Sequence, residues 1–406
     1  MKILWYSNPS WANSGYGIAT KHVLRGLRGR GFEVGLAPNY GFGTGALEVD
    51  GYPVHFMGPD FSEEAAVDHY LKHEYDVLVT LYDVWPLRRL SELVRARGVV
   101  WVPWAMFDHD ALYPAVGERL ESAFHVVSPS RYGKAMLDRA GFTESSHIPL
   151  GVDCKTFRPV DLPKEGLRRE LGFPGDSFVV TIPKMNKGLR PMIPEQLEGV
   201  KLFAEANPDV KTRVYLHTMP NTREGFNLVE VLRALGLSDI ARFPEPYAYL
   251  HGFSPIQMSK VLNSSDVVSV CTASEGFGMP IVESHACGVP AVAGDYTAMR
   301  ELLDPTPELR VRPRANIWFQ VPARYFVPDP EDIADKLERV LNSDPNRYRR
   351  KLPRHARRNY DWSGAVVPKW AELLRSLEAR IEERCVRIPG PSGELRAKAQ
   401  QVEVVG

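Results

Sequence analysis

Apolar and polar stretches alternate along most of this chain, and the alternation predicts parallel strands separated by helices. The first apolar runs are KILWYS, FEVGLAP, YDVLVTLYD, VVWVPWAMFD and HVVSPS. They are rich in β-branched and aromatic residues, as buried strands are. Helical patterns such as IATKHVLRGLRGRG, RLSELVRARG and RYGKAMLDRAG lie between them. This order is typical of an α/β protein with a doubly wound parallel sheet. The glycine-rich segment 39–51 is expected to be a long mobile loop.

A second series of the same kind follows. Its predicted strands are FVVTIPK, VKTRVYLHT, DVVSVCTAS and VPAVAGD, and its predicted helices include PEQLEGVKLFAEANP, NLVEVLRALG and SPIQMSKVLNSSD. The polar, proline-containing stretch VDLPKEGLRRELGFPGD separates the two series and is expected to be a linker. We therefore predict two Rossmann-like domains, residues 1–160 and 176–361. Such a pair places a ligand cleft between the domains, outside the carboxyl ends of both sheets.

Composition changes this picture little. The 406 residues carry 50 basic and 50 acidic side chains, so no overall charge favours nucleic acid or a membrane surface. The basic run 347–358 is interpreted as a solvated helix face. No apolar stretch approaches the length needed to cross a bilayer. The four cysteines are far apart in the sequence and fit reduced thiols. We expect a cytoplasmic protein without stable membrane insertion.

The stretch SEGFGMPIVESHACGVPAVAGDY, residues 274–296, carries the strongest chemical signal. A predicted strand precedes it, a glycine-containing turn leads into a short helix, and another strand follows. The turn presents backbone N–H groups at the start of a helix, where a phosphate group binds well. Two acidic residues, Glu275 and Glu283, flank this turn.

In this order of motifs the chain resembles the family-4 retaining glycosyltransferases, which have the GT-B fold and a glutamate-x7-glutamate signature. The segment ASEGFGMPIVESHACGVPAVAGDYTAMREL resembles that signature. VVSPSRYGKAMLDRAG and IPLGVDCKTFRP are similar to the passage between the two domains, and SGYG stands in the place of the amino-terminal glycine loop. The resemblance extends to about Glu383. It implies that a helix over 362–383 packs back on the first domain, and we expect the tail 384–406 to be poorly ordered.

The resemblance assigns roles to the residues around the turn. Glu283 would accept hydrogen bonds from the ribose hydroxyls of a nucleotide donor, and its place in the first turn of the helix would favour its charge. Glu275 would hold hydroxyls of the transferred sugar. The N–H groups of Gly276, Phe277 and Gly278 would lie beside the donor. Without the resemblance, the two glutamates would be interpreted as a helix-start residue and a solvated loop acid.

The donor diphosphate needs cationic partners, which relatives usually supply as an arginine and a lysine about five residues apart. The segment after the first strand of the second domain offers Lys184, Lys187 and Arg190. We select Arg190, whose planar fork suits phosphate oxygens, together with Lys187. Pro191 stands where a lysine is expected.

Gly15 and Gly17 precede the first predicted helix and would let the backbone approach a phosphate or a sugar closely. An ordinary loop is the alternative interpretation.

The loop FDHDALYP contains an Asp-x-Asp pair, Asp108 and Asp110, which at that spacing can hold a hard cation. Because the second domain offers its own phosphate loop and cationic side chains, we predict no metal. The resemblance implies instead that His109 contacts the transferred sugar, while Asp108 or Asp110 binds acceptor hydroxyls or assists removal of a proton. Asp83, after TLY, is a weaker candidate of the same kind.

The sequence thus predicts a retaining, metal-independent glycosyltransferase that uses a nucleotide-diphosphate sugar as co-substrate and needs no cofactor. Two alternatives remain: a GT-B sugar-nucleotide epimerase, and a non-catalytic module that binds sugar nucleotides or glycans. The sequence leaves open the base and sugar of the donor, the oligomeric state, and whether the acceptor is a glycan, a lipid, a protein or a modified nucleic acid.

Overall fold

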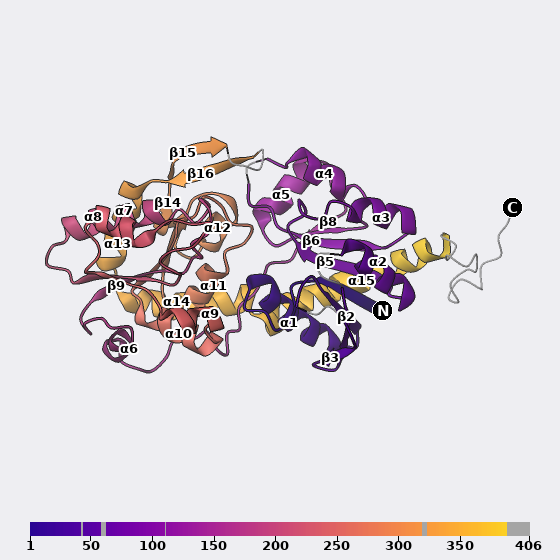
Figure 1. Ribbon diagram of the computed structural model, residues 1–406, viewed down its shortest axis with the longest axis horizontal. Coiled ribbons are helices and arrows are strands. Elements are labelled where there is room, and N and C mark those ends of the chain that lie inside the picture. Colours follow the sequence, from indigo (N-terminus) through magenta and orange to yellow (C-terminus); the bar gives the residue numbers. More distant parts are fainter. Residues whose placement is uncertain (42–43, 58–61, 110, 319–322, 388–406) are drawn as a thin grey trace.

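The computed structural model describes residues 1–41, 44–57, 62–109, 111–318 and 323–387; side chains of Glu382 and of residues 384–387 are excepted. Two α/β domains lie side by side, and the carboxyl-terminal helices lead from the second domain back to the first (Figure 1). Most of the predicted tail, residues 388–406, falls outside the described residues. No helix within the described ranges has the length and apolarity needed to span a membrane.

The amino-terminal domain is built on an eight-stranded sheet of order β3-β4-β2-β1-β5-β6-β7-β8. The strands are β1 Lys2–Ser7, β2 Glu33–Pro38, β3 Leu47–Val49, β4 Tyr52–Val54, β5 Val77–Tyr82, β6 Trp101–Ala105, β7 Val126–Ser128 and β8 Ser145–His147. All neighbouring strands pair in parallel except β3 and β4, which pair antiparallel. The sequence predicted the five central strands. The expected loop 39–51 is partly regular structure, because it contributes β3 to this edge.

Helices cover both faces of this sheet. They are α1 Gly15–Arg28, α2 Glu63–Lys72, α3 Leu90–Arg97, α4 Pro114–Leu120 and α5 Arg131–Arg139. Side chains begin several of them: Ser14 caps α1 and Ser130 caps α5 by accepting a backbone hydrogen bond three residues on.

The carboxyl-terminal domain contains a six-stranded parallel sheet of order β11-β10-β9-β12-β13-β14. Its strands are β9 Phe178–Ile182, β10 Thr212–Leu216, β11 Ala241–Arg242, β12 Val267–Val270, β13 Ala291–Gly294 and β14 Arg310–Val311. Its helices are α7 Ile193–Ala206, α8 Leu228–Leu235, α9 Pro246–His251, α10 Pro255–Ser264, α11 Met279–Ala286, α12 Thr297–Leu302 and α13 Pro330–Leu341. The antiparallel hairpin of β15 Pro313–Trp318 and β16 Arg324–Pro328 projects from it.

The predicted linker contains a helix, α6 Lys164–Glu170, that is attached to the second domain. Arg168 donates two hydrogen bonds to the carboxylate of Asp266, at 2.6 and 2.7 Å, and Lys164 lies 3.2 Å from the same carboxylate. These contacts fix the helix to the start of β12. The stretch was expected to be a linker because of its proline and glycine residues, but Pro163 precedes a helix that continues through Gly166.

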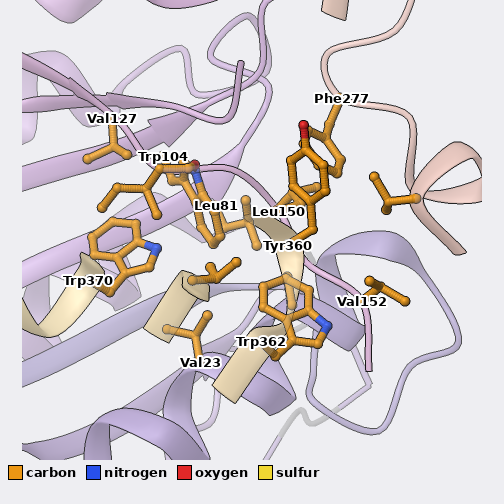
Figure 2. Close-up of a cluster of buried hydrophobic side chains, with 14 of the residues drawn as sticks. Val23, Leu81, Trp104, Val127, Leu150, Val152, Phe277, Tyr360, Trp362 and Trp370 are labelled. Carbon is orange, nitrogen blue, oxygen red and sulfur yellow. The ribbon is translucent and has the colours of Figure 1, made fainter. Parts of the chain in front are cut away.

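Two chain crossings connect the domains, and they lie side by side. On the way out, Val152 exchanges backbone hydrogen bonds with Tyr360 and Trp362 on the way back, at 2.8 and 3.2 Å. Gly151 makes this approach possible, because a Cβ there would lie 2.6 Å from the Trp362 ring. Figure 2 shows these side chains grouped with Trp370 in one buried cluster.

The return crossing is helical on both sides. In the second domain, α14 Pro345–Tyr360 packs against α11, and its basic residues lie on the exposed face as predicted, although the helix continues through Pro353. A π-helical turn, Trp362–Val366, then leads into α15 Val367–Arg387, which packs on α1. Trp370 makes edge contacts with two tryptophan rings of the first sheet. The helix that the resemblance implied therefore does return to the first domain, starting about five residues later than expected.

Candidate active site

A cavity of about 590 Å³ lies between the two domains. The first domain contributes residues from the loops that follow β1, β5 and β6, including Asn13, Asp83 and Asp108. The second domain contributes Arg190, from the loop after β9, and the segment from Glu275 to Glu283 after β12. These loops leave the carboxyl ends of parallel strands in both sheets, the place where such sheets bind ligands. The sequence predicted a cleft at this position.

The glycine turn has the conformation that the sequence suggested. Gly278 has φ of 115° and stands at the start of α11, a backbone conformation that a residue with a Cβ adopts only under strain. Gly276 lies against the first domain, where an added Cβ would be 3.0 Å from that of Met106. The side chain of Phe277 is buried against Tyr360, so this residue can offer the cavity its backbone rather than its ring.

Glu275 is buried and held as a carboxylate. Its Oε1 accepts hydrogen bonds from Lys184 Nζ at 2.6 Å and from the Thr272 hydroxyl at 3.0 Å. Burial acts to raise the pKa of this carboxyl, but Lys184 and Arg190 outweigh it and the pKa is lowered. The site therefore holds a charged acceptor beside two cations.

Glu283 differs from Glu275 in its surroundings. The sequence predicted Glu283 in the first turn of the helix. Because α11 begins at Met279, Glu283 instead lies in the second turn. The stabilisation of charge by a helix start falls off after the first turn. Burial raises the pKa of Glu283 to about 7, against the opposing effect of Lys184. Its carboxyl lines the cavity and lies close to the point of half-ionisation at neutral pH.

The cations of the site are Lys184 and Arg190. The side chain of Lys187 is 65% exposed and pairs with Glu224 at 3.2 Å, outside the residues that line the cavity. Its position therefore does not support the predicted contact with a donor. Lys184, which the sequence also offered, lies two positions after the end of β9; it is not among the residues that line the cavity, but it contacts the cavity-lining Glu275. Pro191 is the residue before Met192 and offers its carbonyl to Gln196.

Arg190 joins the two domains. Its Nη1 donates to Asp108 Oδ2 at 2.8 Å, while the rest of its half-exposed side chain faces the cavity. Burial acts to lower its pKa, but Glu275, Asp108 and Asp83 raise it, so the guanidinium remains charged. For Asp108, burial is outweighed by the hydrogen bond to His109 and by Arg190, and the pKa is lowered.

Asp83 and Tyr16 form a pair on the first-domain side of the cavity. Burial, reinforced by the charge of Asp108, raises the pKa of Asp83 to about 6, and the Tyr16 hydroxyl is its hydrogen-bond partner. Burial and Asp83 in turn raise the pKa of Tyr16 well above its ordinary value. Sequence reasoning gave Asp83 little weight and missed Tyr16. The position of Tyr16 between two glycines of the N-terminal motif was the available signal.

Of the remaining predicted residues, some line the cavity and others do not. His109 lies behind Asp108, 3.4 Å from its Oδ1, and its buried Nε2 has no hydrogen-bond partner among the described residues; it does not line the cavity. Asp110 is outside the described residues. Gly15 lines the cavity, but the helix α1 starts at this residue, so both glycines lie within its first turn rather than in a loop before it. The N–H of Gly17 is used by the Ser14 cap.

Residues 191–343 match the protein family described as "Glycosyl transferases group 1". An "MMP alpha-(1->4)-mannosyltransferase" of Mycolicibacterium hassiacum is 26% identical over 92% of this chain and 75% of its own length. A "D-inositol 3-phosphate glycosyltransferase" of Corynebacterium urealyticum is 27% identical over 58% of this chain and 52% of its own length. The chain thus spans only about half of the latter relative.

Solved structures show the same architecture over nearly the whole chain. Sucrose-phosphate synthase from Thermosynechococcus elongatus superposes with a TM-score of 0.74 at 17% identity, covering 93% of this chain and 99% of that protein. Anabaena Alr3699/HepE in complex with UDP-glucose superposes with a TM-score of 0.68 at 19% identity, covering 93% of this chain and 100% of that protein. The fold is GT-B, as the sequence predicted.

Proposed function

We propose that this chain, a glycosyltransferase of the GT-B superfamily, is a retaining and metal-independent enzyme that transfers a sugar from a nucleotide-diphosphate donor to an acceptor hydroxyl. One observation supports this most strongly. A charged carboxylate, Glu275, accepts a hydrogen bond from Lys184 and lines the interdomain cavity together with Arg190 and the turn of backbone amides. This arrangement offers partners for a sugar hydroxyl and for a pyrophosphate side by side.

The donor fits the second-domain wall of the cavity. The volume of about 590 Å³ is in the range of pockets that enclose ligands of nucleotide-sugar size. In this placement Glu283 accepts hydrogen bonds from a vicinal diol of the ribose, and the amides of residues 276–278 face the phosphates. The similarity to a structure that holds UDP-glucose supports the same class of donor.

The chemistry asked of the protein is chiefly electrostatic. When the bond between the sugar and the diphosphate breaks, negative charge develops on the leaving phosphate. Lys184 and Arg190 are fixed beforehand near that charge, so they stabilise it without reorganisation. In a transfer with retention, the acceptor attacks from the face that the phosphate leaves, and the phosphate oxygen takes the acceptor's proton.

The first-domain wall would position the acceptor. Asp83 and Asp108 line it, and each can accept a hydrogen bond from a hydroxyl group. Arg190 contacts Asp108 across the gap, so donor and acceptor sides are connected by one side chain. Holding both reactants in a fixed orientation lowers the entropic part of the barrier.

The test is incubation with a panel of UDP-, GDP- and ADP-sugars, with and without a chelator, followed by NMR assignment of the anomeric configuration of the product. Transfer or hydrolysis of one donor with retained configuration, unaffected by the chelator, supports the proposal. Conversion of a donor to an epimer with no acceptor would indicate the sugar-nucleotide epimerase. Binding without any turnover, in wild type and Glu275→Gln alike, would indicate a non-catalytic module.

A further inference from the structure

We propose that His55, His69 and His73 form a binding site for a divalent transition-metal ion, zinc in the first place, on the amino-terminal domain and apart from the cavity. One nitrogen from each of the three rings lies within 4.8 Å of the other two, the one such group among the described residues. None of the three lines the interdomain cavity, where no metal is expected.

The chain brings these residues together from two elements. His69 and His73 are four residues apart at the carboxyl end of α2, so one helical turn places them on the same face. His55 directly follows β4, the second strand from the edge of the sheet. Ring centroids of His55 lie 4.7 Å from those of His69 and 4.4 Å from those of His73.

The hydrogen bond of His69 fixes which of its ring nitrogens carries the proton and which is free to bind a metal. His69 Nε2 lies 2.7 Å from the carbonyl oxygen of Phe56, which can only accept, so Nε2 carries the proton. The lone pair is then on Nδ1, and this buried atom has no hydrogen-bond partner among the described residues. His69 itself is 8% exposed. A buried imidazole that gives its N–H to a carbonyl and leaves its other nitrogen free has the arrangement found in metal-ligating histidines.

The second ligand has a hydroxyl partner instead of a carbonyl. His55 Nε2 lies 2.7 Å from the Tyr75 hydroxyl, which can accept as well as donate; in the tautomer where Nε2 donates this bond, Nδ1 carries the lone pair for a metal. Gly35 on β2 makes room for this pair: a Cβ there would be 1.9 Å from the Tyr75 oxygen and 3.3 Å from His55 Nε2.

Binding requires a rearrangement of the rings. The imidazoles lie stacked, with interplanar angles of 21° and 27° to His55, and lone pairs in the ring planes do not converge in that state. In a tetrahedral zinc site with Zn–N of about 2.0–2.1 Å, the nitrogens are roughly 3.4 Å apart. If the rings rotate and their nitrogens approach one another by about 1 Å, the three imidazoles can occupy three of the four positions around the zinc ion. The fourth position is left for water. Three imidazoles without a carboxylate select zinc, cobalt, nickel or copper over calcium or magnesium.

The experiment uses the untagged full chain, stripped with chelator and titrated with Co(II) and then Zn(II). One equivalent of cobalt with a tetrahedral visible spectrum, displaced by zinc, and a rise in melting temperature with zinc are expected. His69→Ala and the less buried His73→Gln should each weaken binding by more than about tenfold, and Tyr75→Phe by about tenfold through loss of the supporting contact. The control His251→Ala, at an exposed histidine on α9, should bind like wild type.

Two results would overturn the proposal. One is wild-type binding no tighter than that of both His69→Ala and His73→Gln, provided the two variants melt as cooperatively as wild type without metal. The other is an octahedral, aquo-like cobalt spectrum. Either would show that the three rings are only a stack of aromatic side chains between β4 and the end of α2.

Discussion

Replacing Lys184 by methionine, and Lys187 by methionine in parallel, should show which of the two lysines contributes to stability and turnover. Lys184 and Glu275 are 2.6 Å apart, and their side chains are 15% and 12% exposed. Removing one partner of a buried pair leaves the other charge poorly compensated, here by Arg190 and the Thr272 hydroxyl alone, at a cost of about 3 kcal/mol. The matched control is Lys187→Met, where the lysine and its partner Glu224 are 65% and 64% exposed. An exposed pair of this kind contributes roughly 0–1 kcal/mol.

Both quantities can be measured directly. At about 2–4 °C per kcal/mol, Lys184→Met should lower the melting temperature of the carboxyl-terminal domain by roughly 6–12 °C in calorimetry, and Lys187→Met by at most a few degrees. If Lys184 stabilises the leaving diphosphate, its loss should reduce kcat by about 10²–10³ in a donor-turnover assay. Lys187→Met should retain wild-type turnover.

A double variant distinguishes a loss of stability from a loss of activity. In Lys184→Met with Glu275→Gln, no unpaired charge remains, so stability should return to near the wild-type value while turnover stays low. The reasoning fails if Lys187→Met loses as much activity as Lys184→Met. It also fails if the double variant recovers turnover together with stability, because the loss would then have been one of folding.

Three further changes test other parts of the site. Burial raises the pKa of Glu283 to about 7, so this carboxyl becomes protonated and loses an acceptor site as pH falls below 7. The KM for the donor should therefore rise below pH 7 and level off above it. In Glu283→Gln the KM for the donor should be raised and independent of pH between 6 and 8. Gly17→Ala would place a Cβ 2.4 Å from the carbonyl oxygen of Ala12 and 2.8 Å from that of Pro9, so it should lower the melting temperature or the yield of folded protein, as circular dichroism would show. Asp108→Asn removes the charged partner of the Arg190 guanidinium and should raise the KM for the acceptor more than that for the donor in steady-state kinetics.

Much of the architecture follows from local patterns. Strands that are buried on both faces appear as continuous apolar runs, and glycine or proline residues mark where they turn into helices. This predicted the central strands of both sheets and the turn at Gly276 and Gly278, whereas the return of the last helix was implied only by the resemblance to GT-B enzymes. Short edge strands such as β3 and β8 were missed because few apolar residues distinguish them. The helix α6 was missed because it is short, contains Gly166 and lies next to prolines and glycines that are typical of a linker.

The candidate site was only partly predictable. The chain order shows that Lys184, Lys187 and Arg190 follow a strand, yet it cannot show which of them turns inward. That depends on the path of the loop after β9, which leaves Lys184 against Glu275 and sends Lys187 toward Glu224. Likewise, the contact of Arg190 with Asp108 joins residues 82 positions apart, and no local pattern records it.

The sequence by itself determined the kind of fold and the turn of amides between two acidic residues, because strand periodicity and glycine conformation are local properties of the chain. Tertiary structure decided which charges meet and how strongly they titrate. Glu275 is a carboxylate and Glu283 is half-ionised near pH 7 although both stand at the same turn, because one was packed against a lysine and the other was buried with less compensation. Electrostatic interactions depend on distance and burial in space, which spacing along the chain does not fix.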